Sequence, residues 1–332
     1  MPYSTLRRER FTFAVSLILM LLNAVLLIYG IVYSLTVVTI IAVLLFLVFT
    51  YKTMLIAPIV LKKQSFTDFD HIGYTGSFQQ TKPKIQVRST KSEIGVLFIH
   101  GFSASTSEFD RLSRELSNRD IPYYVPMITG FGIDSLRLLE TISPKDWVRD
   151  CIDSYDMLSE VAEKIIVVGH SMGGLLAFHL AMHRKIEKLI ITAPYLLEKP
   201  KHVFMKKLLL TPFFGDLLVM VHPYVTKSGK KHLDEPTCSE VKRFVYDRVP
   251  TNAIRALWVL QTDMIYDSVA GLDVTVLFGG MDNTSDAHRV KAVLKSLTKT
   301  NYIVFENSGH NLLEDNERDE VVKTILQRIL PE

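Results

Sequence analysis

This sequence contains few cysteines, and its net charge is small. It has two cysteines in 332 residues, Cys151 and Cys238, too few for a disulfide framework and without the spacing of metal ligands. We expect both to be ordinary buried or half-buried thiols. The formal net charge is only +3, and no basic stripe with interleaved aromatic residues is present. These absences exclude a disulfide-rich secreted domain, a cysteine metal site and a nucleic-acid-binding protein.

Long hydrophobic runs are present, and they gather at the N-terminus. From Phe11 to Tyr51 the sequence has no charged residue. A helix through this stretch would be about 60 Å long, roughly twice the hydrocarbon core of a bilayer. We therefore predict two transmembrane helices, at about 11–30 and 34–52, joined by a tight turn near Gly30. They form an N-terminal membrane anchor at residues 1–57.

Basic residues flank this stretch on both sides, whereas the turn between the predicted helices is uncharged. Arginines stand at positions 7, 8 and 10, and lysines at 52, 62 and 63. The positive-inside rule then places both ends, and the rest of the chain, on the cytoplasmic side of the membrane. A cleaved signal peptide fits poorly, because the apolar region is too long and lacks a small-residue cleavage site. A single tilted span, which would export the rest of the chain, stays open.

Residues 58–332 alternate between strand and helix patterns. Continuous apolar runs predict strands, and amphipathic periods predict helices. This alternation predicts an α/β domain with a mostly parallel sheet flanked by helices. The predicted strands are 85–88, 95–99, 123–125, 165–168, 188–192, 274–278 and 302–305, and the predicted helices are 108–117, 144–162, 318–329 and one that follows Ser171.

One block interrupts the alternation. From Tyr195 to about Trp258 no strand pattern separates the helical and loop-like pieces, so we predict a small helical cap over the carboxyl ends of the strands. Residues 195–235 carry seven lysines, four acids and several bulky apolar residues. We expect the outer edge of the cap, including Lys206 and Lys207, to rest on anionic lipid headgroups. A lid whose lysines face only water is the alternative.

The motif that organises the domain is Gly-His-Ser-Met-Gly at 169–173. It follows an apolar strand pattern and precedes a helix that begins with small residues. In this setting a sharp turn lifts the serine Oγ clear of the sheet, and the helix behind it directs N–H groups at developing negative charge. We interpret Ser171 as a nucleophile, with an idle serine in a glycine-rich turn as the alternative.

A serine nucleophile needs a base. His310 follows the last predicted strand, in the sequence Ser-Gly-His, on a loop from which its imidazole could reach Ser171. His170 is adjacent to the serine, but neighbours at a turn point in different directions, so it fits packing or pocket lining better. His179 and His183 are four residues apart on a helix and lack a third ligand, so we predict no metal site.

The base in turn needs a carboxylate that orients it. Asp282 follows the strand at 274–278 and lies between the serine and the histidine in the chain, which is the order associated with this motif. Asp286 and Asp273 are rivals, although Asp286 also suits the N-cap of the next helix.

Backbone N–H groups of Met172 and Phe102 are the expected oxyanion hole. Phe102 follows His100 and Gly101 at the end of the strand at 95–99, where the glycine lets the backbone turn toward a substrate. We expect His100, Gly101 and His170 to contact the substrate. An ordinary tight turn is the alternative interpretation of the His-Gly pair.

Together these residues resemble the α/β-hydrolase superfamily, and more narrowly the bacterial carboxylesterases and monoacylglycerol lipases with a small cap. The resemblance covers about residues 85–332. It implies an α/β-hydrolase fold and a serine esterase whose catalytic residues are Ser171, Asp282 and His310, with no metal or organic cofactor. The matching segments are HGFSAS at 100–105, SPKDWVRD at 143–150, GHSMGG at 169–174, GGMD at 279–282 and SGHNLLED at 308–315.

Two departures limit what the resemblance implies. Gly-Phe-Gly at 130–132 stands where the family usually has Gly-His-Gly, which affects the pocket shape, and the N-terminal hairpin is not part of the usual pattern. We expect a membrane-anchored serine hydrolase that cleaves carboxylic esters, with acyl lipids such as monoacylglycerols as substrates. Thioester hydrolysis or acyl transfer through the same residues stays open, as does an inactive membrane-tethered interaction protein. The oligomeric state is not predicted.

Overall fold

The computed structural model describes most of the chain. The described residues are 3–32, 36–61, 74–75, 82–133, 136–226, 245–246, 248–297 and 299–330. Cys151 is buried, as expected. The other predictions that fall elsewhere, on the turn residues Tyr33 and Ser34, on Cys238 and on the lysines at 62, 63, 227, 230 and 231, lie outside these residues.

The chain forms two compact units. The first contains α1 (Tyr3–Val32), α2 (Thr36–Leu61) and α8 (Pro212–Val221), and the second contains the sheet and the remaining helices. The predicted boundary between residues 57 and 58 stays a prediction.

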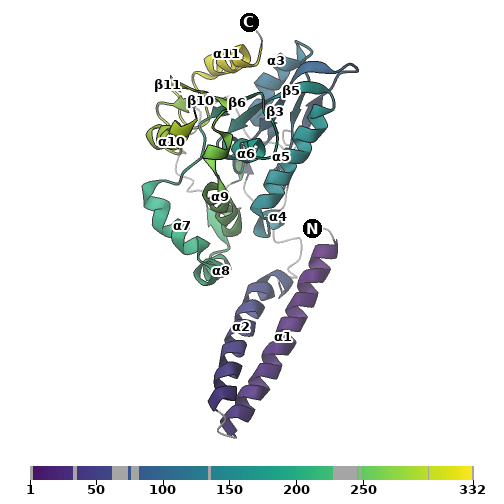
Figure 1. Cartoon of the computed structure of the whole chain (residues 1–332), viewed down its shortest axis with the longest axis vertical. Helices are drawn as coiled ribbons and strands as arrows, with labels where there is room; N and C mark the ends of the chain where they lie inside the picture. The colour runs from purple at the N-terminus through teal and green to yellow at the C-terminus, as the bar shows by residue number, and fades with distance from the viewer. Residues whose placement is uncertain are drawn as a thin grey trace. The chain divides into compact units, whose positions relative to one another are not determined.

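Helices α1 and α2 pack side by side as a hairpin (Figure 1). Both extend beyond the uncharged stretch on which they were predicted, so that α1 takes in charged residues at 7–10 and α2 takes in Lys52. Within the described residues, no helix combines the length and the apolar character needed to cross a membrane. The predicted pair of transmembrane helices is therefore not supported by the structure.

Helix α8 lies within the predicted cap sequence, yet it packs against α2. The Tyr51 hydroxyl lies within hydrogen-bonding distance of two acceptors for its single proton, the Pro212 carbonyl oxygen at 3.0 Å and the Asp216 carboxylate. The Tyr51 ring also lies 5.5 Å from the ring of Phe213. The first unit is therefore assembled from segments about 160 residues apart in sequence.

The second unit is built on a seven-stranded sheet with the order β11-β10-β6-β5-β3-β4-β2. Figure 1 labels β11, β10, β6, β5 and β3 of this sheet. Every neighbouring pair is parallel except β2 and β4, which confirms the prediction of a mostly parallel sheet. The strands are β2 (Lys84–Gln86), β3 (Ser92–Ile99), β4 (Tyr123–Val125), β5 (Ala162–His170), β6 (Lys188–Thr192), β10 (Asp273–Gly279) and β11 (Lys299–Phe305).

Helices cover both faces of the sheet, because successive side chains of a buried parallel strand point to opposite sides. On one face, Phe98 and Val168 pack in a core with apolar residues of α3 (Asp110–Ser117) and α11 (Arg318–Ile329). On the other lie α5 (Pro144–Ser159) and α6 (Met172–Ala181), which pack on β3 and β5. Helix α5 begins with a capping box in which Ser143 and Asp146 bond each other's backbone N–H.

The predicted cap segment is not entirely helical. It holds α7 (Val203–Leu210) and three short strands: β7 (Tyr224–Thr226), β8 (Val245–Tyr246) and β9 (Arg248–Pro250). β7 pairs with β9, and β8 pairs with β1 (Tyr74–Thr75), both antiparallel. The prediction of a strand-free block was wrong, because strands of two or three residues show no detectable period. The last helix, α9 (Thr251–Asp263), runs past the predicted end of the segment.

The remaining helical segments connect these elements. They are η3 (Thr106–Phe109), α4 (Arg137–Glu140), η4 (Pro200–His202), η5 (Tyr266–Val269), α10 (Ala287–Val293) and η6 (Leu294–Ser296).

The position of Lys206 contradicts the prediction that this lysine lies on the outer edge of the cap. Its Nζ donates to a carboxylate oxygen of Glu198 at 2.9 Å and to Oε1 of Gln261 at 3.3 Å, and its side chain is only 14% exposed. Lys206 is therefore held inside the second unit and does not belong to an edge that faces lipid headgroups, whereas Lys207 is exposed.

Helix α6 begins directly against the end of β3, and we expect this contact to tolerate no side chain. A Cβ on Gly173 would lie 1.9 Å from the Ile99 carbonyl oxygen, a backbone atom that cannot move aside. Gly173→Ala should cost about 3 kcal/mol or more of unfolding free energy, or prevent folding. Gly271→Ala is the control, since no atom lies within 4 Å of its added Cβ. Equal thermal unfolding temperatures for the two variants would contradict this close contact.

Candidate active site

The turn between β5 and α6 holds Ser171 in a strained backbone conformation. Its φ of 52° and ψ of −112° lie where residues with a side chain are rarely found. The Ser171 N–H donates to the Thr192 carbonyl oxygen at 2.9 Å, and the Ser171 carbonyl oxygen accepts from Gly174 at 3.1 Å and Tyr195 at 3.2 Å. These three hydrogen bonds, to the last residue of β6, to α6 and to the chain that follows β6, maintain the strain and present the hydroxyl at the sheet edge.

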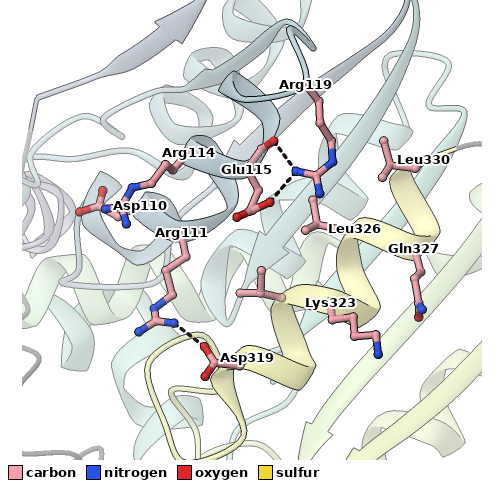
Figure 2. Close-up of a pocket in the computed structure, with 11 residues that line it drawn as sticks. Asp110, Arg111, Arg114, Glu115, Arg119, Asp319, Lys323, Leu326, Gln327 and Leu330 are labelled. Atoms are coloured by element: carbon pink, nitrogen blue, oxygen red, sulfur yellow. Dashed lines mark hydrogen bonds and ion pairs between the residues drawn. The ribbon is translucent and has the colours of Figure 1, made fainter.

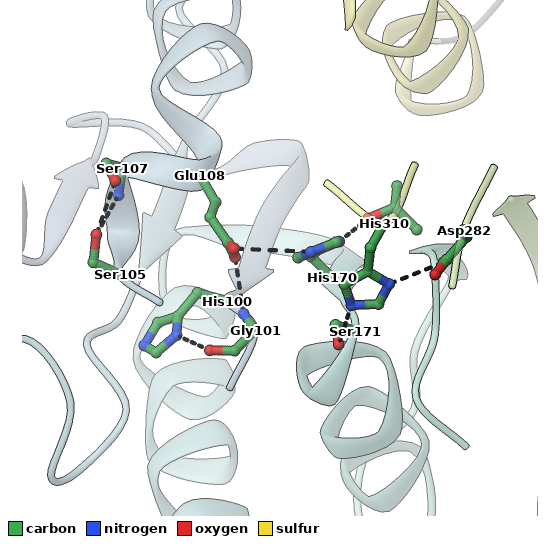
Figure 3. Close-up of polar contacts among 10 residues, drawn as sticks. His100, Gly101, Ser105, Ser107, Glu108, His170, Ser171, Asp282 and His310 are labelled. Atoms are coloured by element: carbon green, nitrogen blue, oxygen red, sulfur yellow. Dashed lines mark hydrogen bonds and ion pairs between the residues drawn. The ribbon is translucent and has the colours of Figure 1, made fainter. Parts of the chain in front are cut away.

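The structure brings together the three side chains predicted to act together. Nε2 of His310 lies 2.9 Å from Oγ of Ser171, and Nδ1 of His310 lies 2.9 Å from Oδ2 of Asp282 (Figure 3). The three residues stand where β5, β10 and β11 end, so the parallel sheet gathers them at one edge. This arrangement can move a proton from the serine hydroxyl to a histidine whose other nitrogen is held by a carboxylate.

Asp282 is held in place by two backbone N–H groups in addition to His310. Its Oδ1 accepts from Thr284 at 2.6 Å and from Ser285 at 2.9 Å. Burial alone raises the pKa of this carboxyl, but the hydrogen bond and charge of His310, together with the two N–H donors, lower the pKa below its usual 3.8. Asp282 is therefore a carboxylate at neutral pH.

The two alternative acids, Asp286 and Asp273, have other positions and contacts. Asp286 caps α10 by accepting from the Arg289 N–H at 3.1 Å, as its sequence position suggested. Asp273 is the first residue of β10, at the opposite end of that strand from Asp282. Of the three aspartates, it is Asp282 that contacts His310.

Buried and partly buried acids shape the loop that carries His310. Asp315 accepts the Gly309 N–H at 2.7 Å, and Glu317 accepts the Asn307 N–H at 2.9 Å and the Ser308 hydroxyl at 2.7 Å. The loop also touches the end of β10, since a Cβ on Gly279 would lie 2.1 Å from the Gly309 carbonyl oxygen. These contacts bring the loops of His310 and Asp282 against each other.

The two predicted oxyanion donors stand beside the serine. Met172 is the first residue of α6, where an N–H has no partner inside the helix. The loop that carries Phe102 lies against the serine, because a Cβ on Gly101 would be 3.5 Å from Cβ of Ser171. The Gly101 N–H donates to Glu108 at 2.8 Å, which makes Phe102 the next backbone donor along this loop.

His100 and His170 are both buried. The Ile128 N–H donates to Nε2 of His100 at 3.1 Å, so the ring proton is on Nδ1, which donates to the Gly101 carbonyl oxygen at 2.9 Å. Burial lowers the pKa of His100 despite the nearby Glu108 charge, which favours this neutral form. Nδ1 of His170 lies 2.9 Å from the Thr192 hydroxyl, and its ring centre is 5.2 Å from that of His310. Substrate contacts of His100, Gly101 and His170 stay predictions.

Phe131 explains what the unusual Gly-Phe-Gly segment does here. Its ring is fully buried, stacks on Trp147 at 5.7 Å and meets the edges of His100 and Phe102. The Asp150 carboxylate holds the same loop by accepting from the Thr129 N–H and hydroxyl, at 2.7 and 3.0 Å. This loop therefore supports the oxyanion segment through aromatic packing.

Two further features of the described chain lie apart from these residues, His179 and a cavity. Among the described residues no group of His, Cys, Asp and Glu could hold a metal ion, and His179 contacts the Leu260 carbonyl oxygen at 2.9 Å. A cavity of about 750 Å³ lies between α3 and α11 and contains none of the predicted site residues (Figure 2). Two of its arginines are paired within it, Arg111 with Asp319 and Arg119 with Glu115.

Comparison with known proteins places this chain in a family. The sequence profile described as "Alpha/beta hydrolase family" matches residues 96–324. A carboxylesterase from Bacillus subtilis (strain 168) is 27% identical over 239 residues, which cover 70% of this chain and 90% of that protein. A thermostable monoacylglycerol lipase from Bacillus sp. (strain H-257) is 30% identical over 90 residues, which cover 27% of this chain and 36% of the lipase.

A solved structure from the study of the metagenome-derived lipolytic enzymes LipS and LipT superposes with a TM-score of 0.63. It has 21% sequence identity and covers 75% of this chain and 97% of its own. At this identity the likeness supports the fold alone. The family profile spans well over half of the sequence and includes the positions of Ser171, Asp282 and His310. The chain therefore belongs to the alpha/beta hydrolase family.

Proposed function

We propose that this protein hydrolyses carboxylic esters through an acyl-enzyme formed on Ser171. The observation that carries the proposal is the chain of contacts from the Ser171 hydroxyl through His310 to Asp282, each 2.9 Å long. The enzyme class, carboxylic ester hydrolase, is supported by the family and by the similarity to a carboxylesterase and a monoacylglycerol lipase.

In the first half of the reaction, Oγ of Ser171 attacks the acyl carbon of the ester while its proton moves to Nε2 of His310. The carbonyl oxygen becomes an oxyanion that the N–H groups of Phe102 and Met172 stabilise. The tetrahedral intermediate collapses, the C–O bond to the alcohol breaks, and the alcohol leaves with the proton from His310. Asp282 keeps the imidazole in the required orientation and stabilises its transient positive charge.

In the second half, water takes the place of the alcohol. His310 accepts a proton as the water oxygen attacks the acyl carbon, and collapse of the second intermediate returns that proton to Ser171 and releases the acid. A thiol ester would react through the same residues, and another alcohol in place of water would give acyl transfer. We propose acyl lipids such as monoacylglycerols as the substrate class, in keeping with the lipase similarity and the apolar first unit.

The first test removes the nucleophile. Ser171→Ala should lower kcat for ester hydrolysis by about 10⁴-fold or more, because no other group on this turn can form the acyl-enzyme. It should also abolish covalent labelling by a fluorophosphonate, with an unfolding temperature near that of the wild type. A Ser171→Ala protein that keeps a tenth of wild-type turnover would refute the proposal. If the wild type is not labelled by the fluorophosphonate, the alternative of a catalytically inactive interaction protein would be favoured.

The second test compares the two neighbouring aspartates. In Asp282→Asn, the amide oxygen would keep the Thr284 and Ser285 N–H bonds, which turns the amide NH₂ toward Nδ1 of His310. The imidazole must then place its proton on Nε2, where it can no longer accept from serine. We expect kcat to fall about 10³–10⁴-fold with a small change in KM. Asp286→Asn is the matched control and should change kcat less than twofold; the reverse ranking would identify Asp286 as the acid.

We further propose that the first unit attaches the enzyme to a membrane, with the hydrolase on the cytoplasmic side. Many large apolar side chains of α1 and α2 are exposed, Leu22 at 55% and Leu44 at 58% among them. Contiguous apolar surface of this kind marks a membrane or protein contact, since burial of each such side chain is worth about 1.5–3 kcal/mol. The basic residues on both sides of the hairpin sequence support the cytoplasmic orientation.

Fractionation and protease accessibility test this attachment. The full chain should sediment with membranes through a high-salt wash, and protease should cut the second unit only after the membrane is opened. Leu22→Glu with Leu44→Glu should release the protein, whereas Ile265→Glu, an equally exposed apolar site of the second unit, should not. Wild type in the soluble fraction would reject attachment, and cleavage in intact cells would support the exported orientation.

A further inference from the structure

Glu108 is a buried acid beside the proposed active site that the reaction scheme does not use. It belongs to η3, is 5% exposed, and accepts the Gly101 N–H with Oε2 at 2.8 Å (Figure 3). Its Oε1 lies 3.8 Å from Nε2 of His170. Burying a carboxylate costs free energy unless hydrogen bonds and charges compensate, and the hydrogen bond from Gly101 and the contact with His170 both involve groups next to Ser171.

The contact with Gly101 acts on the segment that carries the Phe102 N–H. Two successive peptide planes meet at Gly101, and each is held by a different side chain. Glu108 holds the N–H of the first plane, and the protonated Nδ1 of His100 holds the carbonyl oxygen of the second. Because a trans peptide is planar, its C=O and N–H point in opposite directions. Fixing the Gly101 carbonyl oxygen therefore fixes the direction of the Phe102 N–H.

Gly101 has no side chain to restrict rotation between these two peptide planes, so their relative orientation depends on the hydrogen bonds of the planes to Glu108 and His100. Without Glu108, the first plane would lose its acceptor while the second remained tied to His100. Rotation of the first plane would then move Gly101 Cα and the second plane attached to it, so that the Phe102 N–H shifts in position relative to Ser171 even while its carbonyl partner stays bonded to His100. A displacement of about 1 Å in a catalytic group can cost about 10²-fold in rate.

The other carboxylate oxygen faces the serine side of the site. His170 lies between Glu108 and the base, with Nδ1 at 2.9 Å from the Thr192 hydroxyl and its ring beside that of His310. Thr192 is also the residue whose carbonyl oxygen accepts the Ser171 N–H. Glu108 thus contacts the oxyanion loop directly and reaches the nucleophile turn through one buried histidine.

We propose that Glu108 is a positioning residue for the proposed reaction: its carboxylate fixes the Gly101 peptide and thereby aligns the Phe102 N–H with the oxyanion. This inference rests on the proposed function, because it assigns Phe102 as a donor in that reaction. Glu108 touches no reacting atom and acts through the loop.

The test separates alignment from a general effect on the fold. Glu108→Ala should lower kcat about 10–100-fold with KM within about twofold, because the donor acts on the transition state more than on the bound ester. Glu108→Gln keeps an amide oxygen that can accept the Gly101 N–H, and it should retain kcat within about threefold. Glu115→Ala, which removes an exposed acid of α3, is the control and should match the wild type.

The inhibition constant of a trifluoromethyl ketone distinguishes alignment of the donor from a purely structural role of Glu108, because a structural role would not change this constant selectively. The ketone forms a tetrahedral adduct whose oxyanion needs the Phe102 donor, so its inhibition constant should rise with the loss of kcat in Glu108→Ala. The affinity for a carboxylic acid product, which forms no adduct, should stay within about twofold. Wild-type kcat and ketone affinity in Glu108→Ala would overturn the inference while leaving ester hydrolysis intact. Equal losses in Glu108→Gln and Glu108→Ala, or a parallel loss of product affinity, would overturn it as well.

Discussion

The strained turn at Ser171 is the constraint on which the site depends. A non-glycine residue in this backbone conformation costs on the order of 1–3 kcal/mol, so the surrounding structure must hold it. The register of β5 and β6 places Thr192 beside His170, and Thr192 then accepts the Ser171 N–H. The register of β3 and β5 brings Ile99 beside Gly169, which sets α6 against the end of β3. Strand pairing at the centre of the sheet thus determines where the hydroxyl stands.

Beyond the strand ends, carboxylate side chains accept backbone N–H groups that have no neighbouring strand to pair with. The loops after β3, β10 and β11 leave the sheet and lose its regular backbone hydrogen bonds. Glu108, Asp282 and Asp315 each accept backbone N–H groups in one of these loops, and all three are buried. Hydrogen bonds to a charged acceptor are stronger than neutral ones, so a few acids can hold irregular segments. The result is a site whose parts are fixed before a substrate arrives.

The sequence predicted those parts that local pattern determines. The strand at 188–192 and the helix at 318–329 have the predicted bounds, because their apolar patterns are long and regular. Ser171, Asp282 and His310, which contact one another in the structure, could be predicted as a set because each follows a strand pattern. The carboxylates that accept hydrogen bonds from these loops were not predicted from the sequence. Glu108 lies in a short turn with no distinctive motif, and its hydrogen bond to Gly101 depends on how that turn folds back.

Long-range partners account for the errors in the cap. Lys206 was predicted as a surface lysine, yet it is held by Glu198, eight positions earlier, and by Gln261, which lies 55 positions further along the chain in another helix. The short strands β7, β8 and β9 exist because they pair with each other or with β1. A short window of sequence does not contain Lys206 together with Gln261, nor both strands of these pairs. The bounds of α1 and α2 differ from the prediction for another reason: the predicted lengths followed the absence of charge, whereas the observed lengths follow local backbone hydrogen bonding.

The position of α8 means that the two units do not divide at a single point in the chain. The chain leaves the second unit after Thr211, forms α8 against α2, and returns at Pro223. A shortened protein that begins after the hairpin would still contain α8, but it would lose the Tyr51 hydroxyl that bonds Pro212 and Asp216 and the ring that covers Phe213. Phe213 and Phe214 are already half exposed. Removing the N-terminus therefore exposes more apolar surface on α8, and aggregation of such a fragment would not measure the stability of the hydrolase fold.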